Sequence, residues 1–111
     1  MMSARRVVIK IGTSTIAPDG GRIDRAQLDS IVGQVCAIRE SGMQPIIVTS
    51  AAIAAGVERL ELPARPTDMP SLQAAASVGQ VALVEAYAEA FSANGVVVGQ
   101  VLLTRHDTGH R

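Results

Sequence analysis

The sequence predicts an α/β fold with a mainly parallel sheet. Apolar, β-branched runs alternate along the chain with segments of helical periodicity. Right-handed crossovers between such runs place the strands parallel. Aromatic residues make up 2% of the 111 residues, so the core is expected to consist of Val, Ile, Leu and Ala, which is typical of parallel strands packed against helices. The length allows a single domain.

The first strand is predicted at Val7–Ile11, an apolar run that ends at Gly12. A run without polar alternation is normally covered on both faces of a sheet. Asp24 is expected to cap the next helix in a variant of the capping box, with Gln27 three residues later. Gly42 stands where a left-handed C-terminal cap would close this helix. The helix carries one apolar stripe, formed by Leu28, Ile31, Val32, Val35 and Ile38.

The second strand is predicted at Ile46–Thr49, directly after Pro45, because proline can begin a strand but does not fit its middle. From Ser50 onward the residues are small and favour helix, so this strand is expected to run straight into a helix N-terminus. The chain is then broken by three prolines, Pro63, Pro66 and Pro70.

A long Ala-rich helix is predicted from Ser71 to about Asn94, ended by Gly95. Small residues on one side would let this helix pack closely on the sheet; that side carries Leu72, Ala75, Ala76, Gly79, Leu83, Ala86 and Ala90. A third strand is predicted at Val96–Leu103. Three strands are few for a sheet of this kind, so we expect the domain to be incomplete.

Charge and cysteine content exclude several classes of protein. The formal net charge is +0, so the chain has no general electrostatic footprint for nucleic acid or an acidic membrane. Cys36 is the single cysteine, which excludes a disulfide scaffold and fits a reducing compartment. No apolar run approaches the ~20 residues of a membrane span. We therefore expect a cytoplasmic protein with neither a nucleic-acid nor a membrane partner.

Ligands of open parallel sheets gather beyond the carboxyl ends of the strands, where backbone N–H groups and helix N-termini are exposed. One candidate there is Lys10–Ser14: a cation at the end of a strand, a glycine that permits close backbone approach, and two hydroxyl residues. Together these groups suit a phosphate, although the Walker spacing is absent. The alternative is a lysine that extends to solvent from a strand end, followed by an ordinary turn.

The second candidate is Thr49–Ala52, at the junction of the second strand with its helix. A hydroxyl and free N–H groups there can hold a carboxylate or phosphate. The alternative is that Ser50 is simply the helix N-cap, and both interpretations can hold at once.

Other chemically notable residues do not predict a catalytic or metal-binding site. Cys36 lies beside the apolar stripe without a His or Asp at useful spacing, so a buried, inert thiol is expected. His106 and His110 have helical spacing, but no third ligand accompanies them and no metal site is predicted. Tyr87 and Phe91, four residues apart, predict a packing contact. No Ser/His/Asp arrangement and no pair of catalytic carboxylates is evident.

Four blocks of sequence together resemble a known family. In chain order they are VVIKIGTST, PIIVTSAAIAAGVERL, LQAAASVGQ and GQVLLTRHD. In order and spacing they are similar to the N-terminal part of the glutamate 5-kinases, a group within the amino-acid kinases. The resemblance covers nearly the whole chain. A lysine and glycine on the first strand are shared by related kinases, whereas the combination of the later three blocks is particular to this group.

The resemblance implies the amino-acid kinase fold, a three-layer αβα sandwich with a mainly parallel sheet. It also implies an ATP-dependent phosphotransferase with a carboxyl group as acceptor. Such an enzyme converts L-glutamate to L-glutamyl 5-phosphate with Mg2+, the first step of proline biosynthesis. A homo-oligomer is implied for full-length members of the family.

The resemblance also assigns roles to residues of the two candidate sites. Lys10 would be the catalytic residue that neutralises ATP phosphate oxygens, a role suited to phosphoryl transfer, which depends on positioning and charge neutralisation. The phosphate group would be approached by Gly12, Thr13 and Ser14. The serine that binds glutamate in the family matches Ser50, and its neighbours in the substrate site would be Ala51 and Ala52.

Two departures from the family pattern bear on activity. Ala51 stands where the family has glycine, so its methyl group would obstruct a substrate lying against the backbone and would be strained at positive φ. Residues 1–111 are expected to be the N-terminal part of an amino-acid kinase domain that lacks the nucleotide-binding half, and therefore to be inactive alone. Two alternatives remain open: another amino-acid kinase with a different acceptor, or a degenerate, non-catalytic interaction module.

Overall fold

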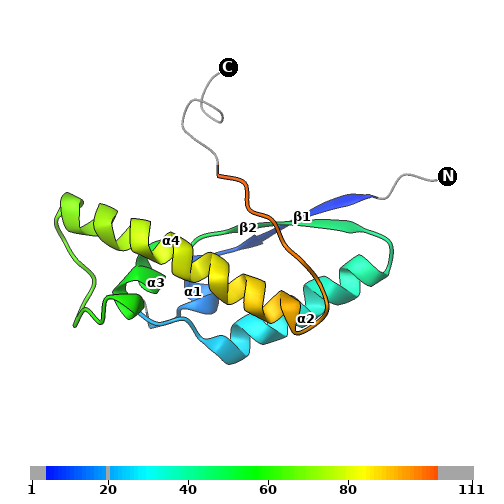
Figure 1. The fold of residues 1–111 in the computed structure, drawn as a ribbon, viewed down its shortest axis with the longest axis horizontal. Coiled ribbons are helices and arrows are strands. Elements are labelled where there is room, and N and C mark those ends of the chain that lie inside the picture. Colours follow the sequence, from blue (N-terminus) through cyan, green and yellow to red (C-terminus); the bar gives the residue numbers. More distant parts are fainter. Residues whose placement is uncertain (1–4, 20, 103–111) are drawn as a thin grey trace, which may run out of the picture.

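The computed structural model describes residues 5–19 and 21–102. They form a mixed α/β structure, which confirms the class predicted from the sequence (Figure 1). The elements in chain order are β1 (Arg6–Ile11), α1 (Thr13–Ile16), α2 (Arg25–Glu40), β2 (Gln44–Thr49), α3 (Ala52–Arg59) and α4 (Met69–Ser92).

The two described strands pair in parallel, with a register that runs from Arg6 opposite Gln44 to Ile11 opposite Thr49. The crossover between them contains α2, as predicted from its apolar stripe. Because the two strands are equal in length and in step, their carboxyl ends lie side by side. Whatever follows β1 is therefore brought next to whatever follows β2.

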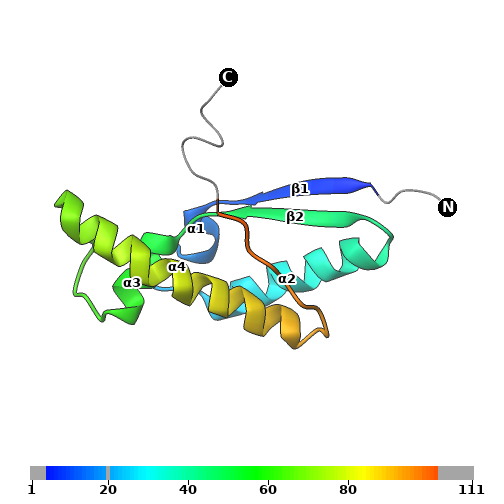
Figure 2. The same ribbon diagram turned by 45° about the horizontal axis from the view of Figure 1, so that its top comes forward.

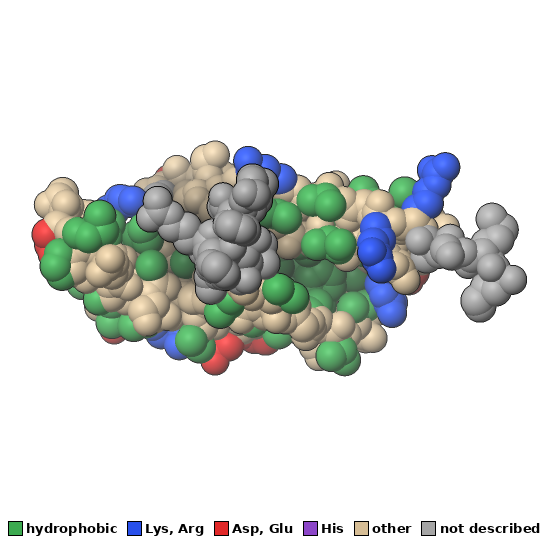
Figure 3. All heavy atoms as spheres, turned by 90° about the horizontal axis from the view of Figure 1, so that it is seen from above, with side chains coloured by type: hydrophobic (Ala, Val, Ile, Leu, Met, Phe, Trp, Pro, Cys, Tyr) green, Lys and Arg blue, Asp and Glu red, His purple; other side chains and the backbone are tan. Residues whose placement is uncertain are grey.

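Helices cover one face of this sheet, and Figure 2 shows α2 and α4 on the same side of the two strands. Side chains alternate accordingly: Ile9 and Ile47 pack against the buried core, whereas Val8, Ile46 and Val48 are 64%, 47% and 49% exposed. Viewed from the strand side, these elements present apolar surface to solvent (Figure 3). The prediction that both faces are covered is wrong for the described residues, because their helices supply only one layer.

The start and end of α2 follow the sequence prediction. Asp24 caps the helix by accepting a hydrogen bond from the backbone N–H of Gln27 at 3.1 Å. The N–H of Asp24 donates instead to the carbonyl of Ile16 at 2.7 Å, so only half of a capping box forms. Gly42, just beyond the helix, has φ of 101°, a conformation that favours glycine. The buried residues of α2 are Leu28, Val32, Val35 and Cys36.

The long helix α4 begins two residues earlier than predicted, at Met69. Asp68 caps it by accepting from the N–H of Ser71 at 3.0 Å. Hydrogen bonds from Ser71 lower the pKa of the Asp68 carboxyl. Pro70 lies in the first turn, where its missing N–H has no helical partner to lose. The sequence interpretation of Pro70 as a chain breaker is therefore wrong, because proline is disfavoured only after the first turn.

The close packing predicted for α4 is made mainly with α3 and not with the sheet. Two glycines bring these helix backbones into direct contact. A Cβ on Gly79 would lie 1.6 Å from the carbonyl oxygen of Ala52, and one on Gly56 would lie 1.8 Å from that of Ala75. The small residues of α4 thus fix the position of α3, and with it the end of β2.

The third strand predicted at Val96–Leu103 is absent from its described part, residues 96–102, and Leu103 lies outside the described residues. The segment follows Gly95, whose φ of 73° ends α4 as expected. Val96 and Val98 pack against the core, whereas Val97 is 95% exposed, so the side chains alternate as in a strand. Alternation reflects extended backbone, but a strand also needs a hydrogen-bonded neighbour, which the described residues do not provide here.

Candidate functional site

Hydroxyl groups from two distant parts of the chain meet where β1 and β2 end. The parallel ladder extends one residue beyond β2, because the N–H of Ser50 donates to the carbonyl of Ile11 at 3.3 Å. Thr13, at the start of α1, then places its Oγ1 2.8 Å from the Oγ of Ser50. The two candidate segments predicted from the sequence therefore form one site.

Lys10 lies near the same end of the sheet, as the next-to-last residue of β1. It is exposed and shares the uncovered face of β1 with Val8, while Ser50 continues the uncovered side of β2 two residues after Val48. Neither side chain is buried against apolar residues. The cation and the hydroxyl are thus presented to solvent from neighbouring strands, at the same end of the sheet.

Gly12 connects Lys10 to the hydroxyl residues and caps α1. Its φ of −78° and ψ of 162° are accessible to any residue. A Cβ built at this position would meet no atom within 4 Å. Neither the backbone nor the packing of the described residues requires glycine, so Gly12 leaves open space against the strand end.

Ser50 is not the N-cap of α3, so that interpretation of its hydroxyl is wrong. The N-cap is Ala51, which has no side chain able to cap, and Ser50 is directed instead to Thr13. Ala51 has φ of 95° and ψ of 16°, in the left-handed region that favours glycine. The turn therefore adopts positive φ, the condition under which strain was expected at this residue.

The methyl group of Ala51 lies in the core cluster, and the residue is only 5% exposed. The positive φ supports the expectation of strain, whereas the burial gives no support to the expectation that the methyl obstructs a substrate. The departure from glycine thus bears on the stability of the turn.

The remaining predicted residues flank the hydroxyl pair. Ser14 is exposed in α1, which has a single turn, and Ala52 begins α3 in a partly buried position. The first hydrogen bond of α3 runs from the N–H of Ala55 to the carbonyl of Ala51 at 2.9 Å. The N–H groups that precede Ala55 have no partner within the helix, which makes them donors suited to an anionic group.

Thr49 and Tyr87 form a second hydroxyl pair that the sequence analysis missed. The Oη of Tyr87, on α4, lies 2.8 Å from the Oγ1 of Thr49, the last residue of β2. Burial raises the pKa of Tyr87, partly offset by the hydrogen bond with Thr49. The packing contact predicted for Tyr87 and Phe91 is consistent with the burial of both rings. A buried tyrosine generally needs a polar partner, which was the available signal.

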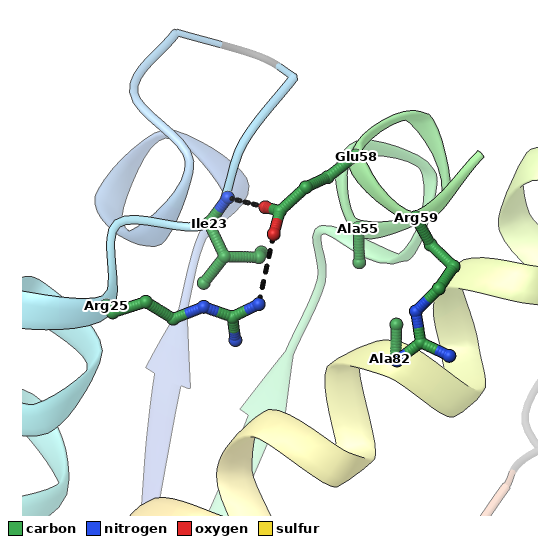
Figure 4. Close-up of a pocket in the computed structure, with 6 residues that line it drawn as sticks. All are labelled: Ile23, Arg25, Ala55, Glu58, Arg59 and Ala82. Atoms are coloured by element: carbon green, nitrogen blue, oxygen red, sulfur yellow. Dashed lines mark hydrogen bonds and ion pairs between the residues drawn. The ribbon is translucent and has the colours of Figure 1, made fainter. Parts of the chain in front are cut away.

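A small hollow elsewhere in the molecule contains none of the predicted site residues (Figure 4). There Glu58 of α3 accepts from the N–H of Ile23 at 2.7 Å and pairs with Arg25 at 3.1 Å. These contacts join α3 to the start of α2. The residues that line the hollow are Ile23, Arg25, Ala55, Glu58, Arg59 and Ala82.

Within residues 5–19 and 21–102, no three His, Cys, Asp or Glu side chains gather in a way that could hold a metal ion. His106 and His110 lie outside the described residues. Cys36 is buried, as predicted. In the part of the chain that the structure describes, no helix has both the length and the apolar character needed to cross a membrane.

The chain is similar to known proteins over nearly its whole length. Residues 5–111 match the family model described as the amino acid kinase family. The chain is 50% identical over 111 residues to a glutamate 5-kinase of Myxococcus xanthus (strain DK1622), 45% over 109 residues to one of Azoarcus sp. (strain BH72), and 50% over 109 residues to one of Mycolicibacterium smegmatis. These alignments cover 98–100% of the chain but only 29–30% of the relatives.

Proposed function

Because the chain belongs to the amino acid kinase family, we propose that it contributes to an ATP-dependent kinase that phosphorylates the γ-carboxylate of L-glutamate. The product is L-glutamyl 5-phosphate, the first intermediate of proline biosynthesis. The observation that carries this proposal is the hydrogen-bonded pair of Thr13 and Ser50, at the end of the sheet toward which β1 carries the exposed Lys10. The matched relatives named glutamate 5-kinase support the choice of acceptor.

Phosphoryl transfer depends on the alignment of donor and acceptor and on neutralisation of negative charge. The acceptor carboxylate binds at Ser50 and the backbone N–H groups at the start of α3, near Ala51 and Ala52. Phosphate oxygens of ATP approach from the end of β1, where Lys10 supplies positive charge. Gly12 leaves room for that approach, and the hydroxyls of Thr13 and Ser14, which follow it in the chain, donate to the phosphate.

The described residues fit a phosphate better than they fit a metal ion. An ammonium group, hydroxyls and open space at Gly12 are suited to phosphate oxygens. The described residues offer no cluster of metal-ligating side chains. Mg2+ would reduce the charge on ATP when bound, and its presence is proposed from the family alone. None of the roles given to the residues above depends on it.

The uncovered face of the sheet supports the three-layer αβα sandwich expected of the family. Val8, Ile46 and Val48 form an exposed apolar strip on this face. In the complete protein, a second layer of helices would bury that strip, with a hydrophobic gain of roughly 25 cal/mol per Å² covered. The cytoplasmic location and the homo-oligomeric state expected from the sequence stay predictions.

A chimera tests the proposed reaction. Residues 1–111 replace the stretch that they match in the Myxococcus xanthus relative, and the product is trapped with hydroxylamine as glutamyl hydroxamate. We expect ATP-dependent hydroxamate with L-glutamate and little with aspartate or N-acetylglutamate. UMP, whose phosphorylated product hydroxylamine does not trap, should give little ADP. Ser50→Ala in the chimera should raise KM for glutamate by roughly tenfold, about 1.4 kcal/mol. Preference for another acceptor would replace the proposed substrate within the same family.

The isolated chain of 111 residues should give no hydroxamate, since it spans about 30% of the length of these relatives. Product from the isolated chain at the rate of the chimera would contradict this part of the proposal.

The role of Lys10 can be tested without turnover, because Lys10 is the only lysine in the sequence. Reductive methylation with 13C-formaldehyde labels this side chain and the N-terminal amine only. Titration with ATP should move the Lys10 methyl resonance and leave that of the N-terminus in place. Lys10→Arg, which carries no label at this position, identifies the resonance. Since the isolated chain is expected to lack the nucleotide-binding half, the deciding measurement repeats the labelling on the chimera, where the resonance lost in Lys10→Arg is that of Lys10. A Lys10 signal that ATP does not move in the chimera would contradict the phosphate-binding role.

A further inference from the structure

Tyr87 reaches from the middle of α4 to the turn that follows β2, through a chain of two hydrogen bonds. The Oη of Tyr87 lies 2.8 Å from the Oγ1 of Thr49, and Thr49 Oγ1 donates to the carbonyl oxygen of Ser50 at 3.2 Å. A threonine hydroxyl has one hydrogen, which is used for Ser50. With that hydrogen donated to Ser50, Tyr87 donates to Thr49, and both bonds form at the same time.

The carbonyl at the end of this chain belongs to the peptide that joins Ser50 to Ala51. Because a peptide unit is planar, holding its oxygen also fixes the orientation of the Ala51 N–H. The next torsion is the φ of 95° at Ala51. An alanine keeps such a conformation only where its surroundings impose it. The hydrogen-bond chain acts on the peptide that enters this strained residue.

We infer that Tyr87 is a positioning residue, which holds the turn at Ser50 and Ala51 in its left-handed conformation through Thr49. The conformation of this turn determines where the Ser50 hydroxyl meets Thr13 and where α3 begins. The consequence for substrate binding rests on the proposed function, whereas the hold on the turn does not. Since burial raises the pKa of Tyr87, its hydroxyl stays protonated and able to donate at neutral pH.

The conformation of residue 51 can be measured by NMR in the 111-residue chain without any substrate. At positive φ, the amide hydrogen and Hα of one residue lie close together. The cross-peak between them in a nuclear Overhauser (NOE) spectrum is therefore strong. We expect a strong cross-peak for Ala51 in the unmodified chain. In Tyr87→Phe, which keeps the ring but loses the donor, it should fall to about half or less, and the amide resonances of Ser50 and Ala52 should move with it.

Thr49 provides a matched pair of variants that leave Tyr87 in place. Thr49→Val is nearly isosteric and removes the hydroxyl, so it should weaken the Ala51 cross-peak as Tyr87→Phe does. Thr49→Ser keeps the hydroxyl and should retain the cross-peak. If Tyr87 only filled space in the core, Tyr87→Phe and Thr49→Val would leave the cross-peak unchanged, and that result would overturn the inference.

The two Thr49 variants keep the test decisive if Tyr87→Phe fails to fold. Failure of the glutamate assay would leave the cross-peaks unaffected, so an error in the proposed substrate and an error in this inference give different results.

Discussion

The turns that follow β1 and β2 lie side by side but differ in residue type, backbone conformation and burial. The first turn has a glycine, Gly12, at a φ of −78° that any residue can adopt, with open space around it. The second has an alanine, Ala51, at a φ of 95° and is buried. α4 contacts the residues on either side of the second turn, Ala52 through Gly79 and Thr49 through Tyr87. A Cβ at Gly12, in contrast, would meet no atom of α4 within 4 Å. Within the described residues, the second turn is stabilised by the fold, while the first leaves room for a ligand.

The largest effect expected concerns the contact that holds the second turn. Gly79→Ala would place a methyl group 1.6 Å from the carbonyl oxygen of Ala52, so α3 and α4 would have to separate. The atoms that the methyl group would meet, the Ala52 oxygen and the Gly56 nitrogen, belong to the helix backbone and cannot move aside as a side chain would. We therefore expect a loss of about 3 kcal/mol or more in the free energy of unfolding, which is at the upper end of the usual cost of overpacking. Urea unfolding followed by circular dichroism measures it.

Gly33→Ala is the matched control, since Gly33 is exposed in α2 and an added Cβ would meet nothing within 4 Å. It should raise the free energy of unfolding by up to about 1 kcal/mol, because alanine favours helix over glycine. Equal effects of the two substitutions would show that the close contact at Gly79 does not hold the turn.

The next effect tests the strain in the second turn itself. Ala51→Gly relieves a left-handed alanine, worth about 1–2 kcal/mol, but loses a buried methyl group worth about 0.8 kcal/mol. We expect a free energy of unfolding that is unchanged or up to about 1 kcal/mol higher. Ala54→Gly loses an equally buried methyl from the interior of α3, where glycine costs about 1 kcal/mol more, so it should destabilise by about 2 kcal/mol.

The two substitutions should differ by about 2–3 kcal/mol in their effect on the free energy of unfolding. This difference isolates the contribution of backbone conformation. A loss at position 51 as large as that at position 54 would mean that the turn is not strained.

The contrast also shows which features the sequence predicts. The two strands and the cap at Asp24 were found because their signals are local: an apolar run, or a carboxylate three residues before the N–H that it accepts from. The pairs formed by Thr13 with Ser50 and by Thr49 with Tyr87 join residues 37 and 38 positions apart. Their residues could be nominated from strand ends, as Thr13 and Ser50 were. The first bond, however, depends on the pairing of β1 with β2, and the second on the packing of α4.

Backbone conformation and strand pairing were the least predictable features. The residue type of Ala51 gives no sign of its positive φ, since alanine normally avoids that region. The signal came from the resemblance, because the family has glycine at this position. The apolar run from Val96 predicted a strand, yet strand formation depends on a neighbour that lies elsewhere in the chain. In both cases the outcome is set by surroundings that single-residue preferences do not contain.

A third effect depends on pH and reports on the tyrosine that reaches the second turn. Burial raises the pKa of Tyr87 above its ordinary value of about 10. The folded state therefore retains the phenol proton more strongly than the unfolded state does. The stability associated with Tyr87 is complete below the unfolded pKa and is lost as pH rises through the folded pKa.

Absorbance at 295 nm follows this ionisation directly, because Tyr87 is the only tyrosine and the chain has no tryptophan. The midpoint should lie higher in the folded chain than in urea. Tyr87→Phe should remove the corresponding loss of stability above about pH 10. A folded midpoint at or below that of the unfolded chain would contradict the burial of the Tyr87 hydroxyl.

The smallest effect on stability is expected at the first turn. Gly12→Ala introduces a methyl group into open space, at a φ that alanine accepts. The substitution lowers the entropy of the unfolded chain, so the free energy of unfolding should rise by about 0.5 kcal/mol. In the chimera, the same methyl would occupy the space proposed for phosphate oxygens, and hydroxamate formation should fall at least tenfold, about 1.4 kcal/mol. Stability and turnover then change in opposite directions, which distinguishes a glycine retained for ligand access from one required by the fold. If the Gly12→Ala chimera kept full activity, the phosphates would have to bind elsewhere.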